Sequence, residues 1–181
     1  MKGALLLLGT LAALLPGAAL AVLTVDLGDP TTHEWTVTYR FEASGVGKTS
    51  MDVLPYDYDE MEILDTAPEK GGGQLKYEAI NEGEAKKPKF RILLPNPLGP
   101  NERMKFRVVA RMKDPEAYFL DVAKLNFLYS TGHEINVTLP EGYLPIYTNE
   151  AMELKWEKNR VVLSSAGGVL RPVVIFGRSC D

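Results

Sequence analysis

The segment EWTVTYRFEA, residues 34–43, alternates strictly between polar and apolar side chains. Its apolar members are Trp35, Val37, Tyr39, Phe41 and Ala43, and its polar members are Glu34, Thr36, Thr38, Arg40 and Glu42. A period of two is typical of a strand with one buried and one solvated face. No helical period fits these residues, so the segment predicts an antiparallel β-strand.

The same alternation recurs along most of the chain. It is clear in residues 104–112, 135–139 and 152–156, and weaker in residues 50–54, 60–64, 74–80, 89–94, 143–147, 161–164 and 169–176. Turn residues separate these runs at 44–47, 71–73, 95–100, 140–142 and 157–160. Short strands divided by frequent turns are typical of a sandwich or barrel, and we expect about nine to eleven strands.

We therefore predict an all-β fold: an antiparallel β-sandwich, immunoglobulin-like or related, of one or two closely packed lobes. The proline-rich turn 95–100 is the expected lobe division. At most one short helix is expected, because Asp114 and Pro115 resemble a helix start. For residues 117–127 a short helical turn followed by a strand is preferred to a helix. The predicted core comprises Trp35, Tyr39, Phe41, Phe106, Val108, Ile135, Val137, Leu154 and Trp156.

Residues 1–21 differ from the rest of the chain, because Lys2 is their only charged residue. An apolar run at 4–15, a helix break at Pro16 and a small-x-small pattern at 19–21 predict a signal peptide cleaved after Ala21. The expected mature domain is then 22–181. The alternative is an uncleaved N-terminal membrane anchor, because residues 4–25 carry no charge.

Composition narrows the class of protein further. Of the 181 residues, 45% are hydrophobic and 24% are charged, with a net charge of −4. These values are ordinary for a globular domain. The acidic excess argues against nucleic acid as the partner.

Two single residues are candidates for covalent modification. Cys180 is the only cysteine, so it cannot form an intramolecular disulfide. It is either an incidental thiol in the C-terminal tail or the site of an intermolecular disulfide. Asn136 opens the tripeptide Asn-Val-Thr, which is an acceptor sequence for N-glycosylation in an exported chain.

The two histidines occur in the same dipeptide, which makes them weak candidates for a metal site. His33-Glu34 and His133-Glu134 each lie at the start of a predicted strand, and two strand starts could meet at one end of a sandwich. HExxH spacing is absent, because Val37 and Val137 stand where the second histidine would be. We expect solvated strand-edge residues here, and predict no metal and no cofactor.

Other short motifs carry no catalytic chemistry. The acidic segment 57–62 lacks the ligand spacing of an EF-hand, and residues 44–50 lack the first glycine of a P-loop. The sequence also contains no nucleophile elbow and no dinucleotide fingerprint. We predict a solvated loop and a hairpin turn for these two segments.

Residues 135–143 read INVTLPEGY, a strand followed by Leu-Pro-x-Gly-Tyr. This segment resembles one found in exported β-sandwiches, namely the N-terminal sandwich of M1-type aminopeptidases and the lumenal region of ribophorin I. The resemblance implies an immunoglobulin-like sandwich outside the cytoplasm. It implies no peptidase chemistry, because the zinc-binding HExxH helix of that family has no counterpart in this sequence.

These observations together predict a non-catalytic extracytoplasmic β-sandwich, secreted, periplasmic or at the cell surface. Its role would be that of a binding or structural module whose protein or envelope partner contacts turns or an open sheet edge. Membrane association is expected only if the N-terminal segment stays uncleaved. The alternative is a metal-binding protein or metal-dependent enzyme that uses His33, Glu34, His133 and Glu134.

Overall fold

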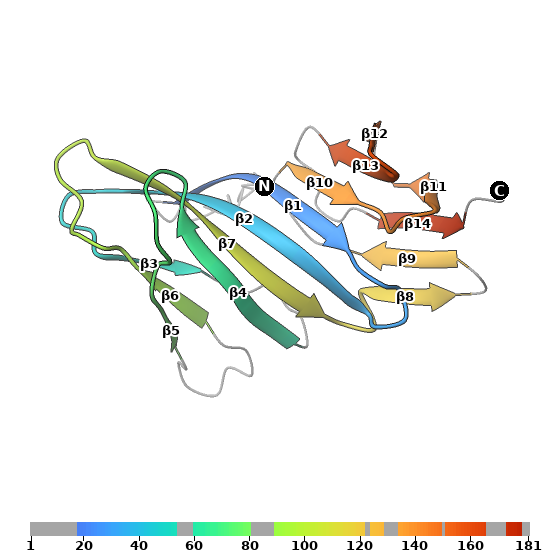
Figure 1. Cartoon of the computed structure of the whole chain (residues 1–181), viewed down its shortest axis with the longest axis horizontal. Helices are drawn as coiled ribbons and strands as arrows, with labels where there is room; N and C mark the ends of the chain where they lie inside the picture. The colour runs from blue at the N-terminus through green and yellow to red at the C-terminus, as the bar shows by residue number, and fades with distance from the viewer. Residues whose placement is uncertain are drawn as a thin grey trace, which may run out of the picture.

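The computed structural model describes residues 18–53, 60–80, 89–121, 124–128, 134–149, 151–165 and 173–178. Within these ranges it contains fourteen strands and no helix, which confirms the all-β prediction (Figure 1). The strands are β1 (Ala18–Leu27), β2 (Glu34–Ser44), β3 (Ser50–Val53), β4 (Glu60–Pro68), β5 (Tyr77–Ile80), β6 (Lys89–Leu93), β7 (Arg103–Lys113), β8 (Tyr118–Asp121), β9 (Lys124–Leu128), β10 (Ile135–Thr138), β11 (Tyr143–Thr148), β12 (Glu153–Glu157), β13 (Arg160–Ser165) and β14 (Val173–Arg178).

The strands form three sheets. The largest has seven strands in the order β12-β13-β10-β1-β2-β7-β4, the second has the order β11-β14-β9-β8, and the third has the order β3-β6-β5. Strands β1 and β10 pair in parallel, and the other pairings described are antiparallel. The long strands β1, β2 and β7 lie side by side across the middle of the molecule (Figure 1).

Strand β2 behaves as its alternation predicts. Trp35, Val37, Tyr39 and Ala43 are buried, and Phe41 packs partly buried against the core. The strand pairs with β7 along its whole length and with β1 on its other side. It therefore has a central position in the seven-stranded sheet, with one face on the core and the other toward solvent.

Aromatic contacts join the seven-stranded sheet to the four-stranded sheet. The Trp35 ring lies edge-on to Tyr118 of β8 and Phe127 of β9, with centroid distances of 6.4 and 5.5 Å. Tyr118 and Phe127 also meet at right angles, 6.1 Å apart. Edge-to-face geometry is favourable for aromatic pairs, so this trio holds the two layers of the sandwich together.

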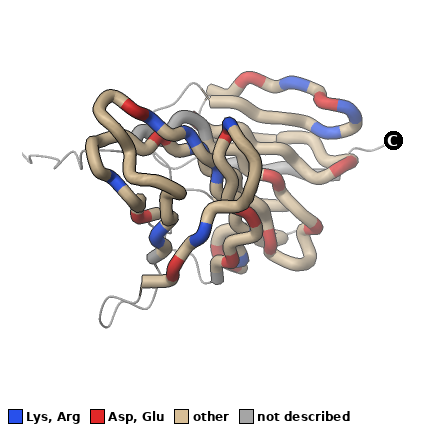
Figure 2. The backbone as a smooth tube through the Cα atoms, turned by 60° about the vertical axis from the view of Figure 1, so that its left-hand side comes forward, with Lys and Arg blue, Asp and Glu red and all other residues tan. Residues whose placement is uncertain are grey.

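The outer face of the seven-stranded sheet is polar. Arg107 of β7 bonds Asp65 of β4, and Arg111 bonds Glu62, each at 3.2 Å. Charges of both signs are interspersed along the chain (Figure 2). Because these ion pairs are exposed, each contributes little to stability. The charged side chains make this face of the sheet suited to contact with water.

The structure corrects the expected number of strands. The described residues alone contain fourteen, where about nine to eleven were predicted for the chain. Strand β1 was missed because its first residues lie in the segment interpreted as a leader, and residues 117–127 form parts of two strands, β8 and β9, instead of a helical turn and one strand.

No helix begins at Asp114, although this residue does cap a turn. Its Oδ1 accepts hydrogen bonds from the backbone N–H groups of Glu116 and Ala117, at 2.8 and 3.1 Å. The chain then extends as β8, because Tyr118 becomes buried and the strand pairs with β9. The capping signal was therefore correctly located, and tertiary pairing prevented the helix from continuing.

The prediction that Leu154 and Trp156 belong to the core is wrong. Leu154 and Trp156 are 46% and 60% exposed, whereas Phe106, Val108, Ile135 and Val137 are buried as expected. The reason is the position of β12, which is the last strand of the seven-stranded sheet. In the described part of the chain, the second layer of the sandwich does not reach far enough to cover the inward face of β12.

Strand β1 crosses the predicted cleavage position. Its pairing with β2 is irregular between Leu20 and Leu23, and is regular from Leu23 to Leu27. The buried positions of β1 for which the side chains are described, Leu23, Val25 and Leu27, all follow Ala21. Cleavage after Ala21 would thus leave the regular part of the strand in the mature chain, and it stays a prediction.

The turn at 95–100 leads from β6 of the three-stranded sheet to β7 of the seven-stranded sheet. Leu98 is buried within it and exchanges backbone hydrogen bonds with Gly47 and Lys48. Phe90 and Ile92 of β6 belong to the same buried cluster as the core of the larger sheets. The described part of the chain contains no helix long and apolar enough to cross a membrane.

Candidate functional site

Three of the four predicted metal candidates lie in the described residues, and they are dispersed. His33 and Glu34 follow the turn after β1, and the Glu34 carbonyl accepts a hydrogen bond from Gly28 N–H at 3.3 Å. The Glu134 carbonyl accepts one from Leu23 N–H at 2.9 Å, near the middle of β1. His133 lies outside the described residues.

This separation follows from the sheet topology. Strand β10 is parallel to β1 and β2 is antiparallel to it, so β2 starts beside Leu27 at the end of β1, whereas β10 starts beside Leu23 near its middle. From Leu23 to Gly28 a strand rises about 17 Å. Glu34 and Glu134 therefore do not converge, and the described side chains include no group of three or more His, Cys, Asp and Glu placed to hold a metal ion.

His33 has a structural contact instead. Its backbone has a φ of 58°, and its Nδ1 lies 2.7 Å from the carbonyl oxygen of Tyr118. The imidazole therefore donates a hydrogen bond that ties the β1–β2 turn to β8. The Tyr118 hydroxyl donates in turn to the Gly28 carbonyl, at 3.1 Å. Two hydrogen bonds between the β1–β2 turn and β8 thus hold the two sheets together at this end of the sandwich.

An open groove of about 850 Å³ lies at this end. Its lining combines apolar and polar side chains: Asp29, His33, Leu120, Leu125, Pro140 and Tyr143. Asp29 accepts two hydrogen bonds from Thr31, at 2.8 Å each, and these lower the pKa of its carboxyl group. The groove is broad and open to solvent, and its lining mixes apolar and polar side chains.

The hydroxyl of Tyr118 is expected to make the stability of the protein depend on pH. Burial, followed by the nearby Tyr143 and Asp29, raises the pKa of Tyr118 above its ordinary value. Its protonated form is therefore favoured in the folded state, so the associated stability is complete below about pH 10 and decreases above it. We expect the free energy of unfolding to fall above that pH by at most about 1.4 kcal/mol per pH unit. Urea titrations at several alkaline pH values measure this slope.

The variant Tyr118→Phe should show a shallower decrease, because it has no hydroxyl to ionise. Tyr147→Phe is the matched control, because the Tyr147 side chain is 53% exposed. The control should keep the wild-type slope. Equal slopes for the wild type and Tyr118→Phe would contradict the assignment to Tyr118.

A second feature is an apolar edge that sequence reasoning missed. Four of the nine large exposed hydrophobic residues in the described chain occur between positions 146 and 157. They are Ile146, Tyr147, Leu154 and Trp156, which we call the open edge. They belong to β11 and β12, which end the second sheet and the first sheet respectively.

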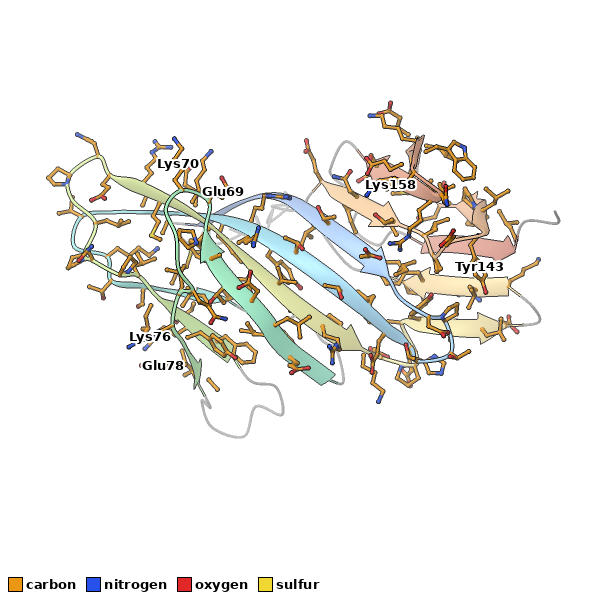
Figure 3. All side chains as sticks on the ribbon, in the orientation of Figure 1. Glu69, Lys70, Lys76, Glu78, Tyr143 and Lys158 are labelled. Carbon is orange, nitrogen blue, oxygen red and sulfur yellow. The ribbon has the colours of Figure 1, made fainter. Side chains whose placement is uncertain are left out.

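The two strands of the open edge lie on one side of the molecule. Strand β11 contacts β13, the neighbour of β12. Figure 1 places β11, β12 and β13 together, and Figure 3 shows Tyr143 and Lys158 on that same side. Alternation in the sequence predicts that a strand has an apolar face, but it does not tell whether another layer covers that face.

The two candidates for covalent modification differ in their placement. Asn136 is half-buried on the outer face of β10, opposite Thr24 and Ser164 of the neighbouring strands. Both sides of its strand are paired, which is unlike the surface loop expected for an acceptor asparagine. Cys180 lies outside the described residues. Glycosylation and an intermolecular disulfide both stay predictions.

No family model matches the chain, and no curated protein matches it in sequence. Solved structures do match. An M1 zinc metallopeptidase from Deinococcus radiodurans matches with a TM-score of 0.54 and 12% identity, over 90% of this chain and 42% of the peptidase. Yeast LTA4 hydrolase matches with a TM-score of 0.56 and 8% identity, over 90% of this chain and 29% of the hydrolase.

A two-domain M1 zinc metallopeptidase bound to L-tryptophan matches similarly, with a TM-score of 0.53 and 13% identity. The chain thus spans less than half the length of each of these proteins. Identities this low carry the fold and no chemistry. The match confirms the resemblance to the M1 family drawn from residues 135–143: this chain has the β-sandwich fold of the N-terminal region of M1 metallopeptidases.

Proposed function

We propose that the protein is a non-catalytic module that binds or supports a partner outside the cytoplasm, in the cell envelope or secreted. The observation that carries this proposal is the match of 90% of the chain to the non-catalytic sandwich region of much longer peptidases. The chain has this fold without an HExxH segment anywhere in its sequence. A fold of this kind supplies surfaces and edges for binding.

Two further features support the location and the role. The segment 1–21 has the charge and hydropathy pattern of a signal peptide. The polar outer face of the large sheet is compatible with solvent, whereas the open edge exposes large apolar side chains on one side. Large apolar side chains exposed close together are a common mark of an interaction site.

Mass spectrometry and N-terminal sequencing of the native protein from fractionated cells test the proposal. We expect an N-terminus at Val22 and recovery in the extracytoplasmic fraction, because Ala19 and Ala21 form the cleavage pattern. An Ala21→Arg variant is the control, since a large charged residue should block cleavage. The same masses report glycan occupancy at Asn136 and the oxidation state of Cys180.

Two results would overturn the proposal separately. A full-length chain recovered from the cytoplasm would remove the extracytoplasmic location. Elemental analysis of untagged protein addresses the non-catalytic role. We expect no stoichiometric transition metal, because Glu34 lies beside Gly28, after the end of β1, and Glu134 lies beside Leu23, near its middle. A stoichiometric metal that is lost on chelation would favour the metal-dependent alternative.

A further inference from the structure

Strand β12 is an edge strand of the described sheet, and its inner face is apolar. All five of its residues, Glu153–Glu157, are exposed. Leu154 lies opposite Leu163, and Trp156 lies opposite Val161, and both of these partners are buried. The apolar layer of the core therefore continues across β13 and emerges into solvent on β12.

The backbone of β12 also has hydrogen-bonding groups that no described strand pairs. A two-residue turn, Lys158 and Asn159, connects β12 to β13, and Lys158 has a φ of 58°. The pair Glu157–Arg160 closes such a hairpin and exchanges both backbone hydrogen bonds. Alternate residues then point their N–H and C=O groups away from β13. These residues are Leu154 and Trp156, so the same two residues present apolar side chains and outward backbone groups.

We propose that β12 pairs antiparallel with β12 of a second copy of this chain, with Leu154 opposite Leu154 on a two-fold axis. Such pairing joins the two seven-stranded sheets into one continuous sheet. It also gives hydrogen-bond partners to the outward backbone N–H and C=O groups of each β12. In this register Met152 lies opposite Trp156 of the second copy. The exposed apolar side chains of β12 then contact their counterparts across the strand pair, which reduces their exposure to water.

The charges of β12 support a second copy as the occupant. With Leu154 at the centre, Glu153 lies opposite Lys155 of the second copy, and this pair occurs twice. Opposite charges directly across two strands are favourable and like charges are unfavourable. The strand is therefore complementary in charge to itself in this register.

Like charges and a smaller number of paired residues disfavour the alternative registers. A shift by two residues in one direction places Glu153 opposite Glu153, which is repulsive. A shift by two residues in the other direction places Lys155 opposite Lys155 and Glu153 opposite Glu157, which is also repulsive. A further shift places Trp156 on the axis and pairs Lys155 with Glu157. It also sets Leu154 opposite Lys158, which lies in the turn, so fewer residues pair. Of these registers, the one centred on Leu154 pairs opposite charges and also places apolar side chains opposite each other.

This inference rests on the proposed function of a binding module. It identifies β12 as the binding surface and a second copy of the chain as the partner. The test is sedimentation equilibrium of the mature chain, with Cys180→Ser as the background to remove any disulfide. We expect a mass twice that of one chain, in a concentration-dependent equilibrium. The single variants Glu153→Lys and Lys155→Glu should each raise the dissociation constant about tenfold or more, because each creates two like-charge pairs.

Charge reversal makes the test specific for the register. An equimolar mixture of the two single variants should form a mixed dimer, since the lysine introduced at position 153 of one chain then faces the glutamate introduced at position 155 of the other. The double variant Glu153→Lys/Lys155→Glu should also recover the dimer in the register centred on Leu154. In the register centred on Trp156, the dimer of the double variant would stay weak, because the glutamate introduced at position 155 would face Glu157. Far-UV circular dichroism of every variant controls for folding, and these residues are all exposed.

Three outcomes would overturn the inference: a wild-type chain that is monomeric at all concentrations tested, a dimer insensitive to both charge variants, or a dimer lost with Cys180→Ser alone. None of these affects the location of the protein or its metal content. The failure of β12 pairing is therefore distinguishable from the failure of the proposed function.

Discussion

Trp35→Ala is expected to lower the free energy of unfolding by about 3–5 kcal/mol. The Trp35 side chain is almost completely buried, and its ring contacts Tyr118 and Phe127 of the opposite sheet. Truncation removes the largest side chain between the two layers and leaves a cavity, so both packing and burial are lost. Urea denaturation monitored by far-UV circular dichroism measures the change.

Trp156→Ala is the matched control, because it makes the same chemical change at an exposed position. Its effect on the free energy of unfolding should stay within about 0.5 kcal/mol under conditions where the protein is monomeric. Similar losses for the two variants would contradict the placement of Trp35 in the core and of Trp156 at the edge.

Val137→Asp should have the second large effect, because it places a carboxylate inside the core. Val137 is fully buried on β10, between Val25 of β1 and Leu163 of β13. An unpaired buried charge costs several kcal/mol, which is comparable to the total stability of a typical domain. We expect the variant to show no cooperative unfolding transition by circular dichroism.

Asn136→Asp is the control for this second prediction. It introduces the same carboxylate one residue earlier, on the outer, half-buried face of the same strand. The variant should unfold cooperatively, with a loss of stability below about 1 kcal/mol. Because the change also removes the acceptor asparagine, both variants are best made in a host without N-glycosylation. A folded Val137→Asp protein would contradict the assigned inward face of β10.

Much of the fold was predictable from local patterns. The alternation in β2 and β7 identified both strands, and the inward side chains Trp35 and Phe106 are buried as expected. The Asp114 capping signal also has the correct position, but it predicts the start of a helix. Whether a helix continued there depended on whether Tyr118 would be buried against another sheet, which is a tertiary property.

The candidate site was less predictable. The identical dipeptides His33-Glu34 and His133-Glu134 suggested that two strand starts meet. The parallel pairing of β1 with β10 separates Glu34 and Glu134 along β1 instead, by about the five residues from Leu23 to Gly28. Strand direction depends on contacts between residues about 110 positions apart, as in the register of Leu23 with Ile135, and no local pattern carries that information.

The sequence by itself determined that the chain forms strands, which face of each strand is apolar, and that its first residues have the pattern of a signal peptide. Tertiary structure alone decided which apolar faces are covered. Leu154 and Trp156 have the same alternation as Val37 and Tyr39, yet only the latter pair is buried. The physical reason is that alternation reports the side-chain chemistry of one strand, whereas burial requires a second layer over it, and β12 lies at the edge of its sheet.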